Sequence, residues 1–269
     1  MRSSQYVSYW IVAALLLATA PAYLTPPLAA GESESEPMDP APVPPQASPS
    51  GFRLGEPRMF IGGHAGINFP RAGSDLFDMV TRELTLGKSD FRASVVGFDF
   101  GLIFRSRYAA VFSMEYSRAT AASESRDFVE EDGSAITQTT RFTQLPVTAT
   151  LRFYPAKMGE HVGSYAWVPA RFLPYLGGGG GFLYYDFNQW GHFVDSQTLE
   201  IFSADLQSSG FVPTVHVVGG IDIGLSSKIL ANLEARYSWA DAKLSSDFIG
   251  FQPIDLAGFR ISGGIVFRF

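Results

Sequence analysis

Charged side chains recur at alternate positions within apolar stretches of this 269-residue sequence. Ionisable groups in such stretches could form a proton path, an ion pore or a ligand site, or they could pair with one another for structural reasons. Equal numbers of acids and bases favour pairing and a closed interior, because leaving a buried charge without its partner costs about 3–5 kcal/mol. The four acids and four bases are Asp99, Glu115, Arg152, Asp222, Glu234, Arg236, Arg260 and Arg268.

Nucleophilic catalysis would need a nucleophile within hydrogen-bond reach of a base. Of the four histidines, His64 and His216 share the charged face, whereas His161 and His192 lie in connecting segments. His192 with Ser196 is the best available pair for an enzyme acting on membrane lipid, but a loop histidine is more often simply solvated. The sequence has no cysteine and no G-x-S-x-G, H-E-x-x-H or phosphate-loop motif. We therefore expect no enzyme activity, no cofactor and no metal site.

Strands are the elements that must position these groups. Aromatic residues make up 14% of the chain, with 23 Phe and 27 Gly, a composition that favours strands and turns over helices. We expect no helix between the strands. Eight runs alternate apolar with small or polar residues, at about 58–69, 91–105, 108–118, 139–154, 173–188, 210–225, 228–240 and 257–269.

The connections between these runs alternate in length. Links one to two, three to four, five to six and seven to eight are long and polar, whereas "SR" and "SS" are tight turns and the link from run four to run five is intermediate. Long loops at one end and short turns at the other are typical of outer-membrane barrels, with the turns in the periplasm. The long loop with "NQWGHFVDS" is apolar enough, at Trp190, Phe193, Ile201 and Phe202, to fold over the barrel mouth or contact a partner.

One face of every run is uncharged, as Phe98, Phe100 and Leu102 illustrate, and the other carries the ionisable groups and many glycines. A soluble barrel would bury the apolar face, whereas a membrane barrel would turn it to lipid. Aromatic residues near both ends of the apolar face favour the membrane barrel, because aromatic girdles mark the two membrane interfaces. The expected girdles comprise Tyr108, Phe153, Tyr175, Phe267 and Phe269 at the periplasmic boundary and Tyr116, Tyr185, Tyr237 and Trp239 at the external boundary.

Run five contains five consecutive glycines, Gly177 to Gly181, flanked by "PYL" and "FLYYDF". No helix is expected to follow them, so a strand midsection explains them better than a phosphate-binding loop. On this alternation Phe182, Tyr184 and Val218 point inward and could line a route for a small apolar molecule.

The N-terminal part divides into two segments ahead of the barrel. Residues 1–30 combine Arg2, the apolar stretch "YWIVAALLLATA" and a small-residue site ending at Ala30, which predicts a secretory signal peptide. Residues 31–56 are rich in Pro, Ser and Glu, which predicts a disordered periplasmic linker before the barrel at 57–269. A net charge of −6 and a pI near 5.2 argue against nucleic-acid binding.

Residues 57–269 resemble the small eight-stranded outer-membrane β-barrel superfamily, which includes the transmembrane domain of outer membrane protein A, outer membrane proteins X and W, and opacity-type proteins. The resemblance lies in "MFIGGHAGINF", "QLPVTATLRFYP", "PYLGGGGGFLYYDF", "GGIDIGLSSKILANLEARYSW" and "RISGGIVFRF". It implies an all-β, antiparallel up-and-down barrel in the outer membrane of a diderm bacterium, surrounded by lipid. It also implies that the barrel-assembly machinery reads the closing strand, through Ile265, Phe267 and Phe269.

For function, we expect a monomer with a structural or surface-interaction role through its external loops and with a lumen plugged by ion pairs. Passage of small, apolar molecules across the outer membrane is the alternative that the resemblance to outer membrane protein W suggests. An enzyme that modifies lipid A is a third and weaker alternative.

Overall fold

A computed structural model describes residues 53–130, 132–163, 166–195 and 198–269 of the chain. Eight strands close into one antiparallel barrel in the order β10-β13-β2-β3-β4-β5-β8-β9, and β9 pairs with β10 to complete the ring. This confirms the predicted eight-stranded up-and-down barrel. The strands are β2 (Met59–Pro70), β3 (Ala93–Phe104), β4 (Tyr108–Val129), β5 (Ala135–Phe153), β8 (Phe172–Val194), β9 (Ile201–Gly224), β10 (Ile229–Trp239) and β13 (Gly258–Arg268).

The closing strand pairs with the opening one along its whole length, from Gly258 opposite Pro70 to Arg268 opposite Phe60. The backbone of Phe269 continues this pairing, since its N–H donates to the Met59 carbonyl at 2.9 Å. The ring therefore has no open edge at its seam, which removes the site where another chain would add a strand.

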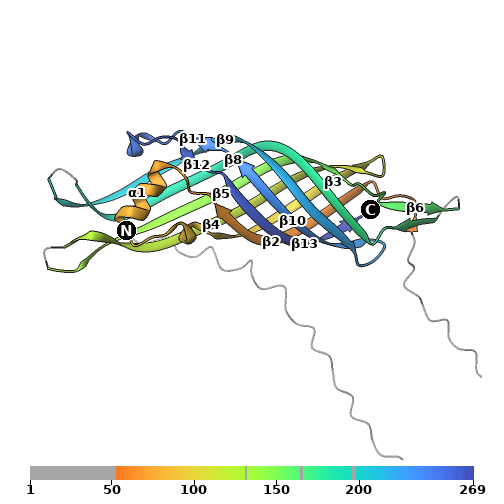
Figure 1. The fold of residues 1–269 in the computed structure, drawn as a ribbon, viewed down its shortest axis with the longest axis horizontal. Helices are drawn as coiled ribbons and strands as arrows, with labels where there is room; N and C mark the ends of the chain where they lie inside the picture. The colour runs from red at the N-terminus through yellow and green to blue at the C-terminus, as the bar shows by residue number, and fades with distance from the viewer. Residues whose placement is uncertain (1–52, 131, 164–165, 196–197) are drawn as a thin grey trace, which may run out of the picture. The chain divides into compact units, whose positions relative to one another are not determined.

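The two ends of the barrel differ in length and content (Figure 1). At one end β4, β5, β8 and β9 reach 22, 19, 23 and 24 residues, whereas β2, β3, β10 and β13 have 11 or 12. The predicted long loops after runs three and five are therefore mostly strand, joined by short turns. Counting apolar alternation missed these extensions because Ser, Thr and charged residues occupy both of their faces. Long extensions mark the extracellular end of such barrels.

The prediction that no helix lies between the strands is wrong for the described residues. Helix α1 (Asp75–Glu83) follows β2 and buries Leu76, Phe77 and Val80 on one side, with Asp75 and Asp78 in its first turn. Such a nine-residue helix depends on packing for its stability, because isolated helices this short are marginal in water. Short elements complete the external end: η1 (Lys88–Phe91), β11 (Asp241–Ala242), η2 (Ser246–Phe248) and β12 (Ile254–Asp255). None of the helices that the structure describes is long and apolar enough to cross a membrane.

The opposite, periplasmic end carries a small sheet of β6 (Gly159–Val162), β7 (Ala166–Pro169) and β1 (Arg53–Leu54), in the order β1-β7-β6. Strand β1 falls inside the segment predicted as a disordered linker, 31–56, so the last residues of that segment are ordered by pairing with β7. Residues 31–52 of the linker and the signal peptide lie outside the described residues.

The exterior of the barrel is apolar and the interior is charged. Phe100, Leu233 and Phe267 are 38%, 54% and 50% exposed on the outer surface, while all eight predicted interior charges are buried. A soluble monomer rarely exposes a contiguous apolar belt of this kind. The distribution is that of a barrel that spans a lipid bilayer, as the alternation of the sequence predicted.

Strand β8 is the place where the predicted alternation is wrong. Tyr175 and Tyr185 are buried inside the barrel and are not girdle residues, whereas Phe182 is 64% exposed on the outside. Tyr184 also faces outward, since its ring lies 5.0 Å from that of the exposed Phe211. The five glycines carry no side chain that marks a face, and aromatic residues occur on both faces beyond them.

The five glycines form the middle of β8, as predicted. At Gly179 an added Cβ would lie 1.9 Å from the Ala149 carbonyl oxygen of the neighbouring strand, a distance that no side chain tolerates. The glycines thus permit a close approach of β8 to β5.

Candidate functional site: a sealed lumen below an external pocket

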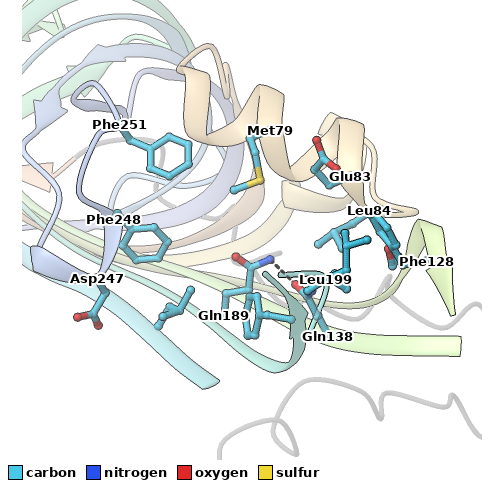
Figure 2. Close-up of a pocket in the computed structure, with 14 residues that line it drawn as sticks. Met79, Glu83, Leu84, Phe128, Gln138, Gln189, Leu199, Asp247, Phe248 and Phe251 are labelled. Atoms are coloured by element: carbon cyan, nitrogen blue, oxygen red, sulfur yellow. Dashed lines mark hydrogen bonds between the residues drawn. The ribbon is translucent and has the colours of Figure 1, made fainter. Parts of the chain in front are cut away.

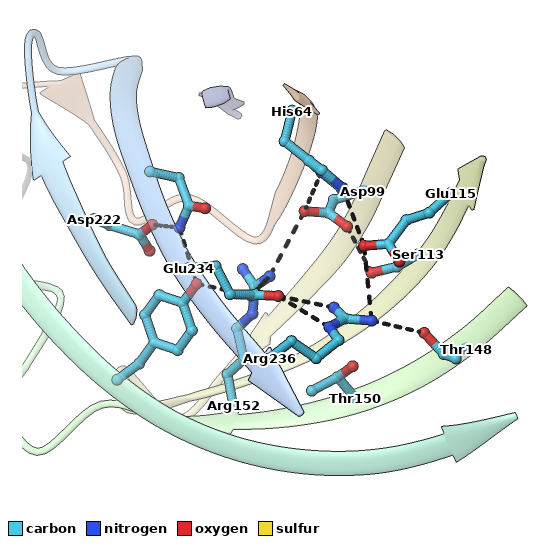
Figure 3. A network of polar contacts seen from close by, with 12 residues as sticks. His64, Asp99, Ser113, Glu115, Thr148, Thr150, Arg152, Asp222, Glu234 and Arg236 are labelled. Atoms are coloured by element: carbon cyan, nitrogen blue, oxygen red, sulfur yellow. Dashed lines mark hydrogen bonds and ion pairs between the residues drawn. The ribbon is translucent and has the colours of Figure 1, made fainter. Parts of the chain in front are cut away.

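The centre of the lumen is filled by one connected network of ionic groups (Figure 3). Glu234 of β10 occupies its middle, accepting from Arg152 Nη2 at 2.7 Å and from Arg236 Nη2 at 2.9 Å. Arg152 Nη2 also lies 3.6 Å from Asp99 Oδ2. The side chains come from β3, β5 and β10, so the contacts join walls of the barrel that are not neighbours in the sheet.

A second carboxylate extends the network towards β2 and β13. Glu115 contacts His64 Nε2 at 3.1 Å and Arg236 Nη1 at 3.9 Å, and it pairs with Arg260. His64 Nδ1 in turn lies 3.4 Å from Asp99 Oδ2. Three carboxylates thus face three guanidinium groups in one cluster.

The last two of the predicted charges lie closer to the periplasmic end. Asp222 accepts from the hydroxyl of Tyr154 at 2.8 Å and from Asn232 Nδ2 at 2.6 Å. Arg268 donates through Nε to the Ser227 carbonyl at 3.0 Å and lies over the ring of Trp167 at 5.3 Å. Through these contacts Arg268 takes part in the periplasmic seal.

Sequence reasoning missed Tyr175 as an interior residue. Its hydroxyl donates to Glu234 Oε2 at 2.9 Å and accepts from Asn232 Nδ2 at 2.9 Å, which links Asp222 to the central network. Its ring also lies under the Arg152 guanidinium at 4.6 Å. A tyrosine has a polar tip that can serve inside a charged lumen, so the residue type alone does not assign it to the lipid face.

The other predicted girdle residues occupy the outer surface of the barrel. Four of them lie near the periplasmic boundary and three near the external one, and Tyr237 packs against Trp239 with ring centroids 4.7 Å apart. The seven are Tyr108, Phe153, Phe267 and Phe269, and Tyr116, Tyr237 and Trp239. Ile265 of the predicted assembly signal faces outward with Phe267 and Phe269.

Little space is left in the lumen around this network. One internal cavity, lined by Arg236 and Arg260 among others, has a volume of about 20 Å³, and a second, lined by Arg152 and Asp222, has the same volume. Each is large enough for about one water molecule. Of the residues predicted to line a route for a ligand, Val218 is inside and buried, while Phe182 and Tyr184 are outside.

A further cavity lies at the external end, among the elements that cover the barrel mouth (Figure 2). Its volume is about 490 Å³, within the range of small-molecule sites. Helix α1 contributes Met79, the η2 region contributes Phe248 and Phe251, and the strand extensions contribute Phe128 and Phe193. The remaining lining residues are Glu83, Leu84, Ser125, Gln138, Gln189, Val194, Leu199, Leu206 and Asp247.

Most of the polar side chains that line this pocket already have hydrogen-bond partners. Gln189 Nε2 donates to Gln138 Oε1 at 2.9 Å, and Gln138 Nε2 donates to a backbone carbonyl. The two carboxylates accept from other groups as well, Glu83 from the Arg82 guanidinium and Asp247 from the Gln207 amide. The pocket can therefore hold an apolar body, and it offers two side-chain amides, two carboxylates and the Ser125 hydroxyl to a polar group.

Sequence reasoning came near this pocket without locating it. Four apolar residues were noted in the connection between runs five and six. Of these, Phe193 lines the pocket, and the ring of Phe202 stacks on that of Phe193 with centroids 6.0 Å apart. Trp190 instead lies under the Arg141 guanidinium, and Ile201 borders a different, open hollow between the hairpin tips. The helix that supplies the other wall was not predicted, so the pocket could not be.

The histidines do not assemble a catalytic centre in the described part of the chain. His192 Nδ1 lies 2.8 Å from Glu130 Oε1 on the surface, and its proposed partner Ser196 lies outside the described residues. His216 Nε2 lies 2.8 Å from Thr150 Oγ1 inside the lumen, and His161 is exposed in β6. No group of three or more His, Cys, Asp or Glu among the described residues is placed to hold a metal ion.

The closed sheet, the lipid-facing exterior and the ionic interior together define an outer-membrane β-barrel. No protein-family model and no curated protein matches the chain. Solved structures that resemble it are themselves outer-membrane proteins.

OprG from Pseudomonas aeruginosa has a TM-score of 0.47 and 16% identity, over 81% of this chain and 98% of that one. Ail of Yersinia pestis has a TM-score of 0.39 and 16% identity, over 80% of this chain and 99% of that one. Outer membrane protein W of Escherichia coli has a TM-score of 0.32 and 13% identity, over 79% of this chain and 98% of that one. Resemblances at this level carry no inference about function.

Proposed function

We propose that this barrel acts at the cell surface by binding a small apolar molecule among its external loops, above a lumen that does not conduct ions. The observation that carries the proposal is the position of the apolar cavity of about 490 Å³ outside the ionic network. A ligand there would be held by Met79, Phe248 and Phe251 without entering the charged interior.

The cover over the barrel mouth supports a defined pocket. Phe77 of α1 packs on Phe187 of β8 with ring centroids 5.8 Å apart, and Phe187 packs on Phe248 at 5.7 Å. The walls of the pocket are thus anchored to the barrel through buried aromatic contacts, and a ligand need not order them from a loose state.

The test uses the full chain in nanodiscs and the fluorophore N-phenyl-1-naphthylamine, with empty nanodiscs subtracted. We expect saturable binding of one molecule per barrel. A Met79→Trp substitution fills the cavity and should weaken binding about tenfold or more, equivalent to 1.4 kcal/mol. Ile249→Trp is the matched control, since Ile249 is 84% exposed and does not line the pocket. Equal binding by the Met79→Trp variant and the wild type would contradict the proposal.

Passage of a small apolar molecule into the bilayer is the second candidate, favoured by a break in the pairing of β4 with β5. The paired residues go from Met114 opposite Val147 to Ser117 opposite Gln144, and Pro146, which has no N–H to donate, lies in the gap between them. Release of the bound fluorophore into the surrounding lipid distinguishes passage from capture. Passage predicts that Pro146→Ala, which restores a backbone donor in this gap, slows this release, whereas capture predicts no change.

We also propose the steps that bring the chain to its site. Export by a signal peptide over residues 1–30 and tethering by the segment 31–56 are supported by their composition. Recognition of Ile265, Phe267 and Phe269 by the assembly machinery, and a monomeric barrel, follow from the resemblance stated above. Catalysis on lipid A has no supporting arrangement among the described side chains.

A further inference from the structure

Three arginines gather just above the lipid-facing belt on one side of the barrel. On β4 the outward positions are Phe112, Met114 and Tyr116, all 38–48% exposed, and the next outward residue is Arg118. The change from apolar to charged marks the height at which the strand leaves the hydrocarbon. Arg118 therefore lies at the level of the outer-leaflet headgroups.

Pairing of the strands places the other two arginines beside it. Arg118 lies opposite Thr143, and Arg141 lies opposite Thr120, so the two arginines are diagonal neighbours on β4 and β5, at about 7–8 Å. Arg92 directly precedes β3, in which Val95 lies opposite Ser117. Continuing this register brings Arg92 to the height of Thr120.

Each guanidinium rests on an aromatic ring of the barrel. Arg118 lies 5.6 Å from the ring of Tyr116, Arg92 lies 5.5 Å from that of Phe69, and Arg141 lies 5.2 Å from that of Trp190. Such stacking orients the side chains and lowers the entropy lost when a ligand binds.

Other contacts of these arginines engage only part of their donors. Arg118 Nε donates to Thr143 Oγ1 at 3.3 Å, and Arg141 Nε lies 3.9 Å from Asp186 Oδ2. A guanidinium carries five N–H donors in a planar fork, which matches the oxygens of a phosphate group.

At the same height on other strands, the charged side chains are acids or an arginine that is already paired with an acid. Arg71, which follows β2, is bound by Asp255 at 2.6 Å. The first charged residues beyond the belt on β8 and after β10 are acids, Asp186 and Asp241. The positive charge is therefore concentrated over β3, β4 and β5.

We propose that Arg92, Arg118 and Arg141 form a binding site for the phosphate groups of a lipid headgroup in the outer leaflet. The three side chains point outward from the barrel wall into the headgroup layer, so the ligand of this site is a neighbouring lipid and not a molecule from the medium. Charge, height and the fork geometry of three adjacent guanidinium groups all match a headgroup with more than one phosphate.

The test compares the wild-type chain with a triple variant, Arg92→Gln, Arg118→Gln and Arg141→Gln. Both are reconstituted in phosphatidylcholine vesicles that contain lipid A, with or without its phosphates, and are then extracted in mild detergent. Mass spectrometry of the extracted barrels counts the lipid A retained per barrel. We expect the triple variant to retain about tenfold less of the phosphorylated lipid.

Lys243→Gln is the control, since Lys243 is an exposed cation on the loop after β10 and lies outside the arginine cluster. It should retain as much lipid A as the wild type. Heat-modifiable migration of all variants on a gel verifies that each barrel has folded. The proposal is overturned if the folded triple variant retains as much phosphorylated lipid as the wild type, or if the wild type retains the dephosphorylated lipid equally well.

Discussion

The external and periplasmic ends of this barrel are both closed, but they are closed in different ways. At the periplasmic end, Trp167 of the small sheet is buried against Met158, Tyr154 and Leu173, next to a cavity of only about 20 Å³. At the external end, α1, η2 and β12 share one apolar cluster with Phe142 and Phe187 of the barrel, but a cavity of about 490 Å³ remains beside it.

The difference indicates separate tasks for the two ends. Close packing around one large side chain excludes water more tightly, because the cavity left beside it has room for only about one water molecule. A cover built from a helix and several short segments can enclose space for a guest. The periplasmic end is therefore a seal, and the external end is where a ligand has room.

Between the two ends lies the ionic network, which could block ion flow through the lumen even if one end were open. Replacing Glu234 by Gln removes the carboxylate that Arg152 and Arg236 share, and should lower the free energy of unfolding by about 3–5 kcal/mol. Urea unfolding in micelles, followed by tryptophan fluorescence, measures the change. Glu124→Gln, on the exposed extension of β4, is the control and should change stability by less than about 0.5 kcal/mol.

Planar bilayer recordings of the Glu234→Gln variant then sharpen the comparison. If both ends seal the lumen, the variant should remain silent although it is less stable. Resolvable conductance steps in this variant, with none in the wild type, would show that the network alone blocks the lumen and that the ends leak.

The second prediction compares the two closures directly. Trp167→Ala empties a fully packed site and should destabilise the protein by about 3 kcal/mol or more, the usual cost of removing a buried aromatic side chain. Phe248→Ala at the external end should cost less than Trp167→Ala, because the Phe248 side chain already borders a cavity and so has fewer packing contacts to lose. The same urea titration ranks the two, and a larger effect for Phe248→Ala would reverse the assignment of seal and pocket.

The barrel could be predicted from the sequence because the pattern that defines it lies within each single strand. Alternation with a period of two is visible at each strand, and the sorting of charges to one face at Asp99, Arg152 and Glu234 needs no knowledge of which strands are neighbours. Equal numbers of acids and bases then predicted pairing, but not the particular partners. Those depend on the stagger of strands across the lumen, which no single strand encodes.

Features that depend on distant contacts could not be obtained in this way. Helix α1 has only three buried apolar residues and forms against side chains more than 50 positions away, such as Phe142 and Phe187. The direction of Tyr175 was lost at the five glycines, where the sequence has no side chain to mark a face. The external pocket requires both the helix and the strand extensions, and neither was predicted from the sequence.

The third prediction concerns how the external cover is fastened, and it has the smallest expected effect. Asp255 of β12 accepts from Arg71 Nε at 2.6 Å and from the backbone amides of Gly73 and Ala257 at 3.0 Å each. The same carboxylate raises the pKa of Arg71 above its ordinary value, through their hydrogen bond and their opposite charges. The contacts hold the chain that enters α1 against the strand that leads into β13.

Asp255→Asn keeps the shape of the side chain but weakens these hydrogen bonds, which should cost about 1 kcal/mol of stability. Because the contacts lie in the cover and not in the sheet, the effect should appear as faster hydrogen exchange at the amides of α1, with the exchange of β10 and β13 unchanged. Asp247→Asn, in the neighbouring η2, is the control and should leave α1 unchanged. Faster exchange throughout the barrel would mean that the cover and the barrel open together. The external cover would then not be a separately opening part of the protein, and the difference between the two ends would be smaller than their packing indicates.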